Sequence, residues 1–227
     1  MRARIGCGPG IGQGVGRGVR LGVAAIALAG LAGCADLGAL GGGGSGPGIR
    51  ALALMGGAVR VRGPEGYCVD QRASDARRGF AVLAGCALIS DQAAVMPTLD
   101  GLITVQFGES GSAIVSGNEE AFADFLTSDA GRAVLADDGD ASHIADVAAT
   151  GANGTVVARF EDTSGPAFEG TTGAEWRGFQ DIGSRLVTMS VLSFARAPLS
   201  RAEGERLLAV AMAELARANA PDAQDAP

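Results

Sequence analysis

Few residues in this chain could do chemistry. Its 227 residues include one histidine, His143, and four cysteines, and all 18 basic residues are arginine because the chain contains no lysine. Without lysine it can form no Schiff base with a carbonyl substrate, and it lacks the lysine of a phosphate-binding P-loop. Catalysis would therefore depend on His143, on a serine or cysteine nucleophile, or on a pair of carboxylates.

The short segments that could mark a catalytic centre all depart from known patterns. His143 lies in an acidic segment where Asp140 or Asp146 could orient it as a base, but an isolated histidine in such a loop is more typical of an exposed or capping residue. The segment around Ser110 lacks the final glycine of the nucleophile elbow G-x-S-x-G, so a hairpin turn is the better interpretation. Residues 162–165, with the sequence DTSG, carry one residue more than the D-T-G of aspartic proteases.

Neither a metal site nor a cofactor site is predicted. The acidic residues 137–140, with the sequence DDGD, could attract calcium, but they lack the spacing and the distal glutamate of an EF-hand, and a solvated loop is expected. Trp176 precedes Phe179 in a strand-like segment, so we expect it in the core rather than against a ligand. A carboxylate pair for glycoside hydrolysis stays open, because its members meet only in three dimensions.

Residues 1–33 have the composition of an export signal. Arginines extend to Arg20, no acidic residue precedes Cys34, and the apolar run from Leu21 to Leu31 is shorter than the roughly 20 residues of a membrane span. Residues 31–34 read Leu-Ala-Gly-Cys, which resembles the lipobox of bacterial lipoproteins. The resemblance implies that the Cys34 thiol is alkylated by a diacylglyceryl group, that a signal peptidase cuts before Cys34, and that the new amino terminus is acylated.

A lipoprotein of this kind is anchored in a membrane of the cell envelope and faces the periplasm. Two or three acyl chains make a stable anchor, whereas a single chain binds only marginally. Ala35 follows the cysteine, at the position where enteric lipoproteins retained in the inner membrane resemble one another in carrying aspartate. The resemblance therefore favours the outer membrane.

The remaining cysteines predict a disulfide. Cys7 lies in the leader and Cys34 carries lipid, which leaves Cys68 and Cys86 as a pair in an oxidising compartment. Both lie in strand-like segments. The alternatives are a thiol nucleophile or half of a metal site. Either would need further residues, but the chain has no C-x-x-C motif and its single histidine is His143.

The charge balance argues against nucleic acid as a partner. The formal net charge is −7, and the four arginines of the leader leave 14 basic residues against 25 acidic ones in the rest of the chain. Binding to phosphate backbones or anionic headgroups relies on clustered basic residues. We therefore expect the acidic surface to repel both.

The chain divides into a signal peptide (1–33), a lipidated cysteine with a glycine-rich tether (34–50), one domain (51–218) and a disordered tail (219–227). Within the domain, residues 71–78 are expected to form a loop, residues 102–107 and 112–115 a hairpin, and Asn118 a helix cap before a helix with Phe122, Phe125 and Leu126 on one face. A second short helix is expected to begin near Ser128. The other predicted elements are strands at 58–62, 66–70, 79–86, 155–160, 175–179 and 185–195, and a helix that begins with the capping box of Ser200 and Glu203 and buries Leu208, Met212 and Leu215.

These elements predict an α+β domain, an antiparallel sheet with helices packed on it. Residues 185–195 are apolar on both alternating sets, so they should form a long central strand, with the C-terminal helix after it. The order of elements resembles the Mog1/PsbP-like fold. The sequence is also similar to uncharacterised lipoproteins of alphaproteobacteria, through the segments GYCVD, GFAVLAGCALI, EWRGF and RLVTMSVLSFARAPLS. We expect a non-catalytic binding or structural role, with an envelope protein as possible partner; the alternative is an envelope hydrolase that uses an Asp/Glu pair.

Overall fold

The computed structural model describes residues 48–90 and 96–220. The expected signal peptide, Cys34, the tether up to residue 47 and residues 221–227 lie outside the described part. Among the described residues, no helix is both long enough and apolar enough to cross a membrane.

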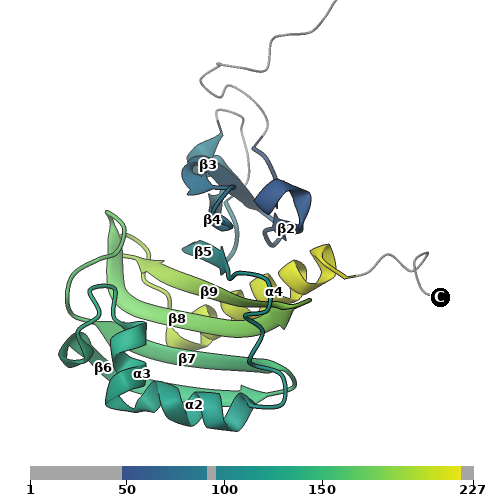
Figure 1. Ribbon diagram of the computed structural model, residues 1–227. Helices are drawn as coiled ribbons and strands as arrows, with labels where there is room; N and C mark the ends of the chain where they lie inside the picture. Colours follow the sequence, from purple (N-terminus) through teal and green to yellow (C-terminus); the bar gives the residue numbers. More distant parts are fainter. Residues whose placement is uncertain (1–47, 91–95, 221–227) are drawn as a thin grey trace, which may run out of the picture. The chain divides into compact units, whose positions relative to one another are not determined.

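The domain is built on a seven-stranded antiparallel sheet with the strand order β3-β4-β5-β9-β8-β7-β6 (Figure 1). This arrangement confirms the predicted α+β class. The sheet strands are β3 (Tyr67–Asp75), β4 (Phe80–Gly85), β5 (Gly101–Phe107), β6 (Ile144–Ala152), β7 (Thr155–Asp162), β8 (Thr171–Ile182) and β9 (Arg185–Phe194). The other elements are the hairpin of β1 (Ala51–Leu54) and β2 (Val59–Arg62), the helices α1 (Cys86–Ile89), α2 (Glu119–Thr127), α3 (Asp129–Leu135) and α4 (Arg201–Ala218), and the 3-10 turns η1 (Met55–Gly57) and η2 (Ala141–His143).

Strand β9 is the central strand, as its sequence predicts. It pairs with β5 on one side and β8 on the other, so every backbone hydrogen-bonding group along it can be satisfied within the sheet. Val187, Met189 and Val191 are buried on one face, and Ser190 and Leu192 on the other. Burial on both faces explains why this strand is apolar in both alternating sets.

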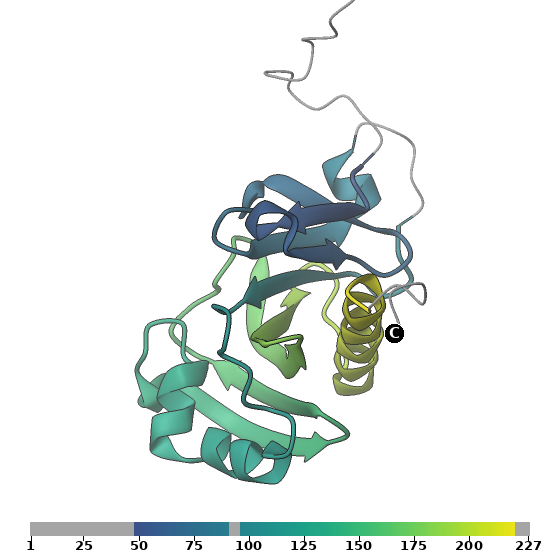
Figure 2. The same cartoon turned by 45° about the vertical axis from the view of Figure 1, so that its right-hand side comes forward.

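Helix α4 and the β1–β2 hairpin cover one face of the sheet (Figure 2). The predicted capping box is confirmed: the Ser200 hydroxyl accepts from the Glu203 amide, and the Glu203 carboxylate accepts from the Ser200 amide at 2.9 Å. Leu208, Met212 and Leu215 are buried, as expected of the inner face of this helix.

Helices α2 and α3 cover only the β6–β7–β8 part of the opposite face. Leu126 of α2 and Leu135 of α3 pack there with Phe160 and Phe179 in a separate apolar cluster. The neighbouring part of the same face, over β4, β5 and β9, has a smaller cluster in which Phe168 of the β7–β8 loop takes part. A hollow between these two clusters contains the candidate site.

The predicted hairpin at residues 112–115 is wrong. These residues form no strand. They lie beside the end of β8 instead, where the Asp181 carboxylate accepts hydrogen bonds from three consecutive amides, those of Ile114, Val115 and Ser116. The Ser112 hydroxyl accepts from the Leu186 amide at 3.0 Å. The partners of this segment lie some 70 residues further along the chain, so a local turn signal could not reveal them.

Several other local predictions need correction. Strand β3 continues through a bulge to Asp75, where a loop was expected, and β1 and β6 were not predicted. Asn118 precedes α2, but its side chain does not cap it, and Phe125 is exposed rather than buried with Leu126. Asn219, expected in the frayed tail, is held by two hydrogen bonds of its side chain to the backbone of Arg60.

Candidate functional site

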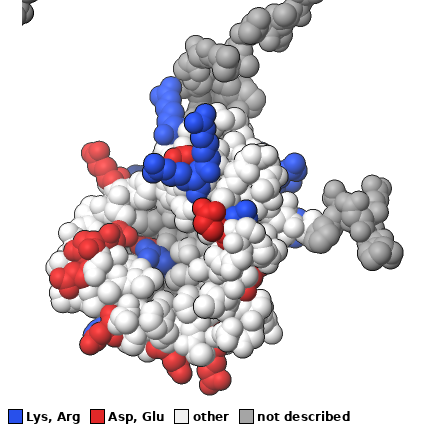
Figure 3. Space-filling model, in the orientation of Figure 1, with Lys and Arg blue, Asp and Glu red and all other residues white. Residues whose placement is uncertain are grey.

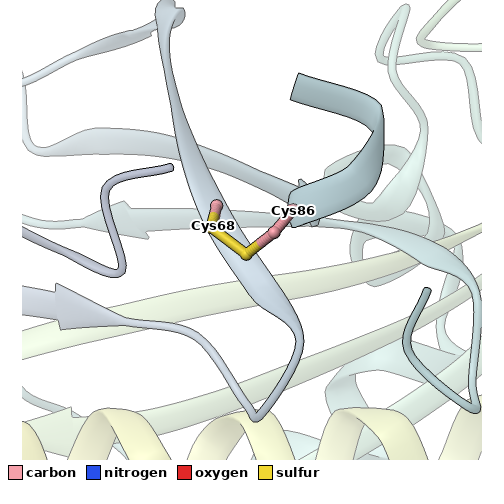
Figure 4. The surroundings of a disulfide bond; sticks show 2 residues. All are labelled: Cys68 and Cys86. Carbon is pink, nitrogen blue, oxygen red and sulfur yellow. A yellow bond between two sulfur atoms is a disulfide. The ribbon is translucent and has the colours of Figure 1, made fainter. Parts of the chain in front are cut away.

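The structure contains the predicted disulfide between Cys68 of β3 and Cys86 at the start of α1 (Figure 4). The two Cα atoms lie 4.8 Å apart, and the bond closes a sequence separation of 18 residues. Because both thiols are consumed, neither can act as a nucleophile or a metal ligand. The neighbouring Tyr67 is also structural: its hydroxyl donates to the Leu99 carbonyl at 2.6 Å, and burial raises its pKa to about 12.

His143 lies on the surface, in the way expected of an isolated histidine in an acidic loop. Its Nδ1 is 2.7 Å from the Asp138 carboxylate, and both side chains are about 40 % exposed. The hydrogen bond with Asp138 raises the pKa of His143. Asp140, one of the partners suggested by the sequence, instead caps η2 by accepting from the Ser142 amide. Among the described residues, no nucleophile hydrogen bonds to this ion pair.

The other residues that the sequence marked for possible chemistry make contacts within the fold. Ser110 is exposed, and its hydroxyl lies 3.0 Å from the Ser184 hydroxyl. Trp176 is buried in the core, where the sequence predicted it. Asp162 of the DTSG segment is buried: burial acts to raise its pKa, but hydrogen bonds from the Asp137 and Ser164 amides and the Ser164 hydroxyl outweigh this and lower it. Within the described residues, no group of three or more histidine, cysteine or acidic side chains could hold a metal ion.

A pocket of about 180 Å³, which the motifs do not indicate, opens on the sheet face that also carries α2 and α3. Figure 3 shows a hollow on this face with basic atoms inside it and acidic side chains nearby. Across β5, β9 and β8, Thr104 pairs with Ser190, and Ser190 pairs with Arg177, so these three side chains form a polar row on one face. The pocket is lined by Phe80, Thr104, Asp137, Ala167, Phe168, Glu175, Arg177, Ser190 and Leu192.

Arg177 organises the floor of the pocket. Its Nε donates to the Glu175 carboxylate at 2.8 Å and to the Ser190 hydroxyl at 2.9 Å, and its Nη1 donates to the Leu135 carbonyl at 3.0 Å. Its Nη2 lies 2.5 Å from Glu175 and 3.6 Å from an Asp137 oxygen. The guanidinium thus joins β8 and β9 to the end of α3, which fixes the geometry of the pocket.

The two carboxylates of the pocket are held differently. The Glu175 side chain is 5 % exposed, whereas that of Asp137 is 37 % exposed. Burial raises the pKa of both groups, and the positive charge of Arg177 opposes this rise. Asp137 is therefore the charged group of the pocket that an incoming ligand can reach, and Glu175 is the internal counter-ion of Arg177.

Only part of this site could be found from the sequence. Glu175 and Arg177 are two residues apart in a strand, so their side chains share a face, and two charges between buried apolar residues are a signal of an internal ion pair. Asp137 follows α3, and Phe168 lies in the β7–β8 loop. Only the tertiary fold brings these two residues to the pocket.

No protein-family model matches the chain, and no curated protein matches its sequence. Two solved structures are similar in fold. One is a mutant of protein Mog1, with 12 % identity over 74 % of this chain and 93 % of that chain and a TM-score of 0.41. The other is the Ran-binding protein Mog1p of Saccharomyces cerevisiae, with 11 % identity over 76 % of this chain and 95 % of that chain and the same TM-score. The order of elements in the sequence resembles the same family.

Proposed function

We propose that this protein is a lipoprotein of the bacterial envelope, anchored through acylated Cys34, whose domain binds another envelope protein through the pocket around Arg177. The leader and the lipobox sequence LAGC support export and acylation. The Cys68–Cys86 disulfide supports an oxidising compartment, because such bonds persist outside the reducing cytosol. Ala35 supports the outer membrane as the site of the anchor.

The observation that carries the binding role is that the protein itself holds Arg177 in place. Its guanidinium has acceptors on Glu175, Ser190 and the Leu135 carbonyl, so the floor of the pocket is fixed before any ligand arrives. Ser190 accepts from a guanidinium and has no histidine or lysine beside it, so nothing activates it as a nucleophile. A preorganised polar floor that lacks a reactive group suits recognition.

The charge of the pocket favours a cationic group. Arg177 compensates one of the two carboxylates, and the more exposed Asp137 supplies the remaining negative charge. Phe80 and Phe168 add aromatic rings to the lining, and such rings attract cations. At about 180 Å³ the pocket is smaller than the roughly 300–1,000 Å³ of sites for whole small molecules. It therefore fits the end of one arginine or lysine side chain of a partner.

Site-specific photo-crosslinking in cells tests this proposal. A benzophenone amino acid at Ala167, an exposed pocket residue, should give a discrete protein adduct that disappears when Asp137→Asn is added. The same probe at Val210, which is exposed on α4, serves as the control. Equal adducts from both positions, or none from Ala167, would overturn the binding role of the pocket.

A hydrolase is the second candidate, because two carboxylates meet in this pocket. Oxygens of Glu175 and Asp137 lie within 3.6 Å of the same Arg177 nitrogen, and both carboxyl groups have raised pKa values. Pairs of carboxyls roughly 5–10 Å apart hydrolyse glycosidic bonds, with a raised pKa on the acid. Against this, Glu175 is bound to Arg177 and almost inaccessible.

Release of reducing ends from purified cell-wall glycan separates the two candidates. The hydrolase requires turnover by the wild-type protein that falls at least a hundredfold in Glu175→Gln and in Asp137→Asn. The binding protein shows no turnover with either variant or with the wild type, while the crosslink at Ala167 still depends on Asp137.

A further inference from the structure

The acidic net charge of the chain conceals a strong segregation of charge. Residues 48–90 hold six arginines and three acidic residues, a net charge of +3. Residues 96–220 hold eight arginines and eighteen acidic residues, a net charge of −10. The domain therefore does not present a uniformly acidic surface to its surroundings, and the expectation that all of it repels anionic headgroups needs revision.

Five of the six arginines of the first segment lie on β2, on the bulged part of β3 and in the β3–β4 turn. Arg60 and Arg62 point outward from β2, Arg72 lies in the bulged part of β3, and Arg77 and Arg78 lie in the β3–β4 turn; all five are exposed. The Met55 amide donates to the Ala76 carbonyl at 2.7 Å, which brings the tip of the β1–β2 hairpin against the β3–β4 turn. Figure 3 shows basic side chains over this end of the domain. We call these five residues the arginine end.

Little of this positive charge is neutralised internally. Among the described residues, Arg78 alone of the five makes an ion pair, an exposed one with Asp75 at 3.5 Å. The carboxylates of Asp70 and Asp75 accept hydrogen bonds from backbone amides of the same turns. The guanidinium groups thus remain available to phosphates, which they bind in a bidentate manner.

The described chain starts beside β3, the strand that carries Arg72, but at the opposite end of this strand from the β3–β4 turn. Gly48 lies against Cys68, and the Ile49 carbonyl accepts from the Val69 amide of β3 at 2.7 Å. Cys34 precedes Gly48 by 14 residues, a length that spans about 50 Å at most when fully extended. An anchor at Cys34 therefore limits how far β3 can lie from the membrane.

We propose that the arginine end docks onto the anionic phospholipid headgroups of the membrane that holds the Cys34 anchor. This inference rests on the proposed anchoring and adds a second, electrostatic attachment that orients the domain. Each basic residue near an anionic surface strengthens binding by about fivefold.

The acidic residues of α2 and α3 are too distant to cancel this attraction. Strands β3 and β6 are the two edges of the sheet, and six spacings of about 4.8 Å separate them by roughly 29 Å. The acidic residues of α2 and α3, which include Glu119, Glu120, Asp124 and Asp129, lie over the β6 edge. Ionic screening reduces interactions beyond about 8 Å at physiological salt, so these charges have little effect on headgroups at the β3 edge.

Vesicle sedimentation of the chain from residue 34 onward, with Cys34→Ser to remove lipidation, tests the docking. The protein should bind vesicles of phosphatidylethanolamine with about one third phosphatidylglycerol, should not bind phosphatidylcholine vesicles, and should dissociate in 0.5 M salt. Arg77→Gln with Arg78→Gln should weaken binding at least tenfold. Arg201→Gln with Arg206→Gln, the same charge change at exposed positions of α4, should weaken it less than twofold.

Equal losses in the two double variants, or equal binding to both kinds of vesicle, would overturn the docking. So would an absence of binding at millimolar lipid. Labelling of the wild-type chain with palmitate in cells is measured separately. Labelling without vesicle binding leaves the anchor intact and overturns the docking alone, whereas vesicle binding without labelling overturns the anchor and leaves the arginine end as the attachment.

Discussion

Arg177 and Glu175 lie two residues apart on β8 and form a buried ion pair, with 2.8 Å between the arginine Nε and a carboxylate oxygen. Side chains two apart in a strand share a face, so β8 itself builds the pair. Charges so deeply placed interact strongly with whatever remains when one is removed. The stability of the domain should therefore depend on both residues together.

Glu175→Gln should lower the free energy of unfolding by about 3 kcal/mol, because it leaves the guanidinium of a 13 % exposed arginine without its main counter-ion. Urea unfolding measures the loss. Asp129→Asn, which breaks the exposed pair with Arg132, is the matched control and should cost less than about 1 kcal/mol. Similar losses in both variants would show that Glu175 does not hold the floor of the pocket.

His143 should titrate above the ordinary pKa of 6.5, because its hydrogen bond with Asp138 favours the imidazolium. A raised folded-state pKa means that the His143–Asp138 ion pair is fully present below pH 6.5 and is lost as pH rises through the folded pKa. The single histidine gives one set of ring signals, so NMR titration assigns the value directly. Asp138→Asn should lower the pKa, whereas Asp146→Asn should leave it within error; the reverse order would contradict the assigned partner.

Removal of the disulfide should destabilise the domain by about 3 kcal/mol, the chain-entropy value for a loop of this length. Cys68→Ala with Cys86→Ala should show this loss in urea, and the loss should match that of the wild type after reduction. Mass mapping of the protein isolated from cells without reductant should recover a peptide that joins both cysteines. Two free thiols there would contradict the pairing.

Gly204→Ala should destabilise the protein although alanine is the better helix former. A Cβ at this position of α4 would lie 2.2–2.5 Å from ring atoms of Trp176, and such overpacking costs about 1–3 kcal/mol or more. Helix propensity opposes this with about 1 kcal/mol in favour of alanine. Ala202→Gly, at an exposed position of the same helix, measures the propensity alone. A gain of stability in Gly204→Ala would show that α4 can move away from Trp176.

The strongest predictions from the sequence concern segments whose signals are local. Strand β9 carries apolar side chains on both of its faces because both faces are buried. Helix α4 begins with a capping box. The sequence therefore predicted both elements. Strand β6, with the sequence IADVAATGA, is a half-exposed edge strand rich in alanine and glycine, and such residues favour no strand. The segment 112–115 depends on Asp181, a partner that no local pattern reveals.

The site was harder to predict than the fold. The cysteine pair was correctly joined, because only two cysteines remained for the domain. The pocket combines residues of four strands and two loops, and only Glu175 and Arg177 were close enough in sequence to be recognised as a pair. The charge segregation was present in the sequence, but a total over the whole chain conceals it.

The lipid anchor is the prediction on which the cellular role depends, and Cys34→Ser tests it. Cells supplied with labelled palmitate should incorporate the label into the wild-type protein, because the thiol of Cys34 is the acceptor that the lipobox resemblance implies. The serine variant should carry no label and should leave the membrane fraction at high salt, when the arginine end no longer holds it.

Density fractionation of the wild type should place it with the outer membrane, as Ala35 favours. Arg77→Gln with Arg78→Gln, which keeps Cys34, is the matched control and should retain its label and its membrane fraction. Label on the serine variant would contradict the anchor, and recovery of the wild type in the inner membrane would contradict the sorting inference alone.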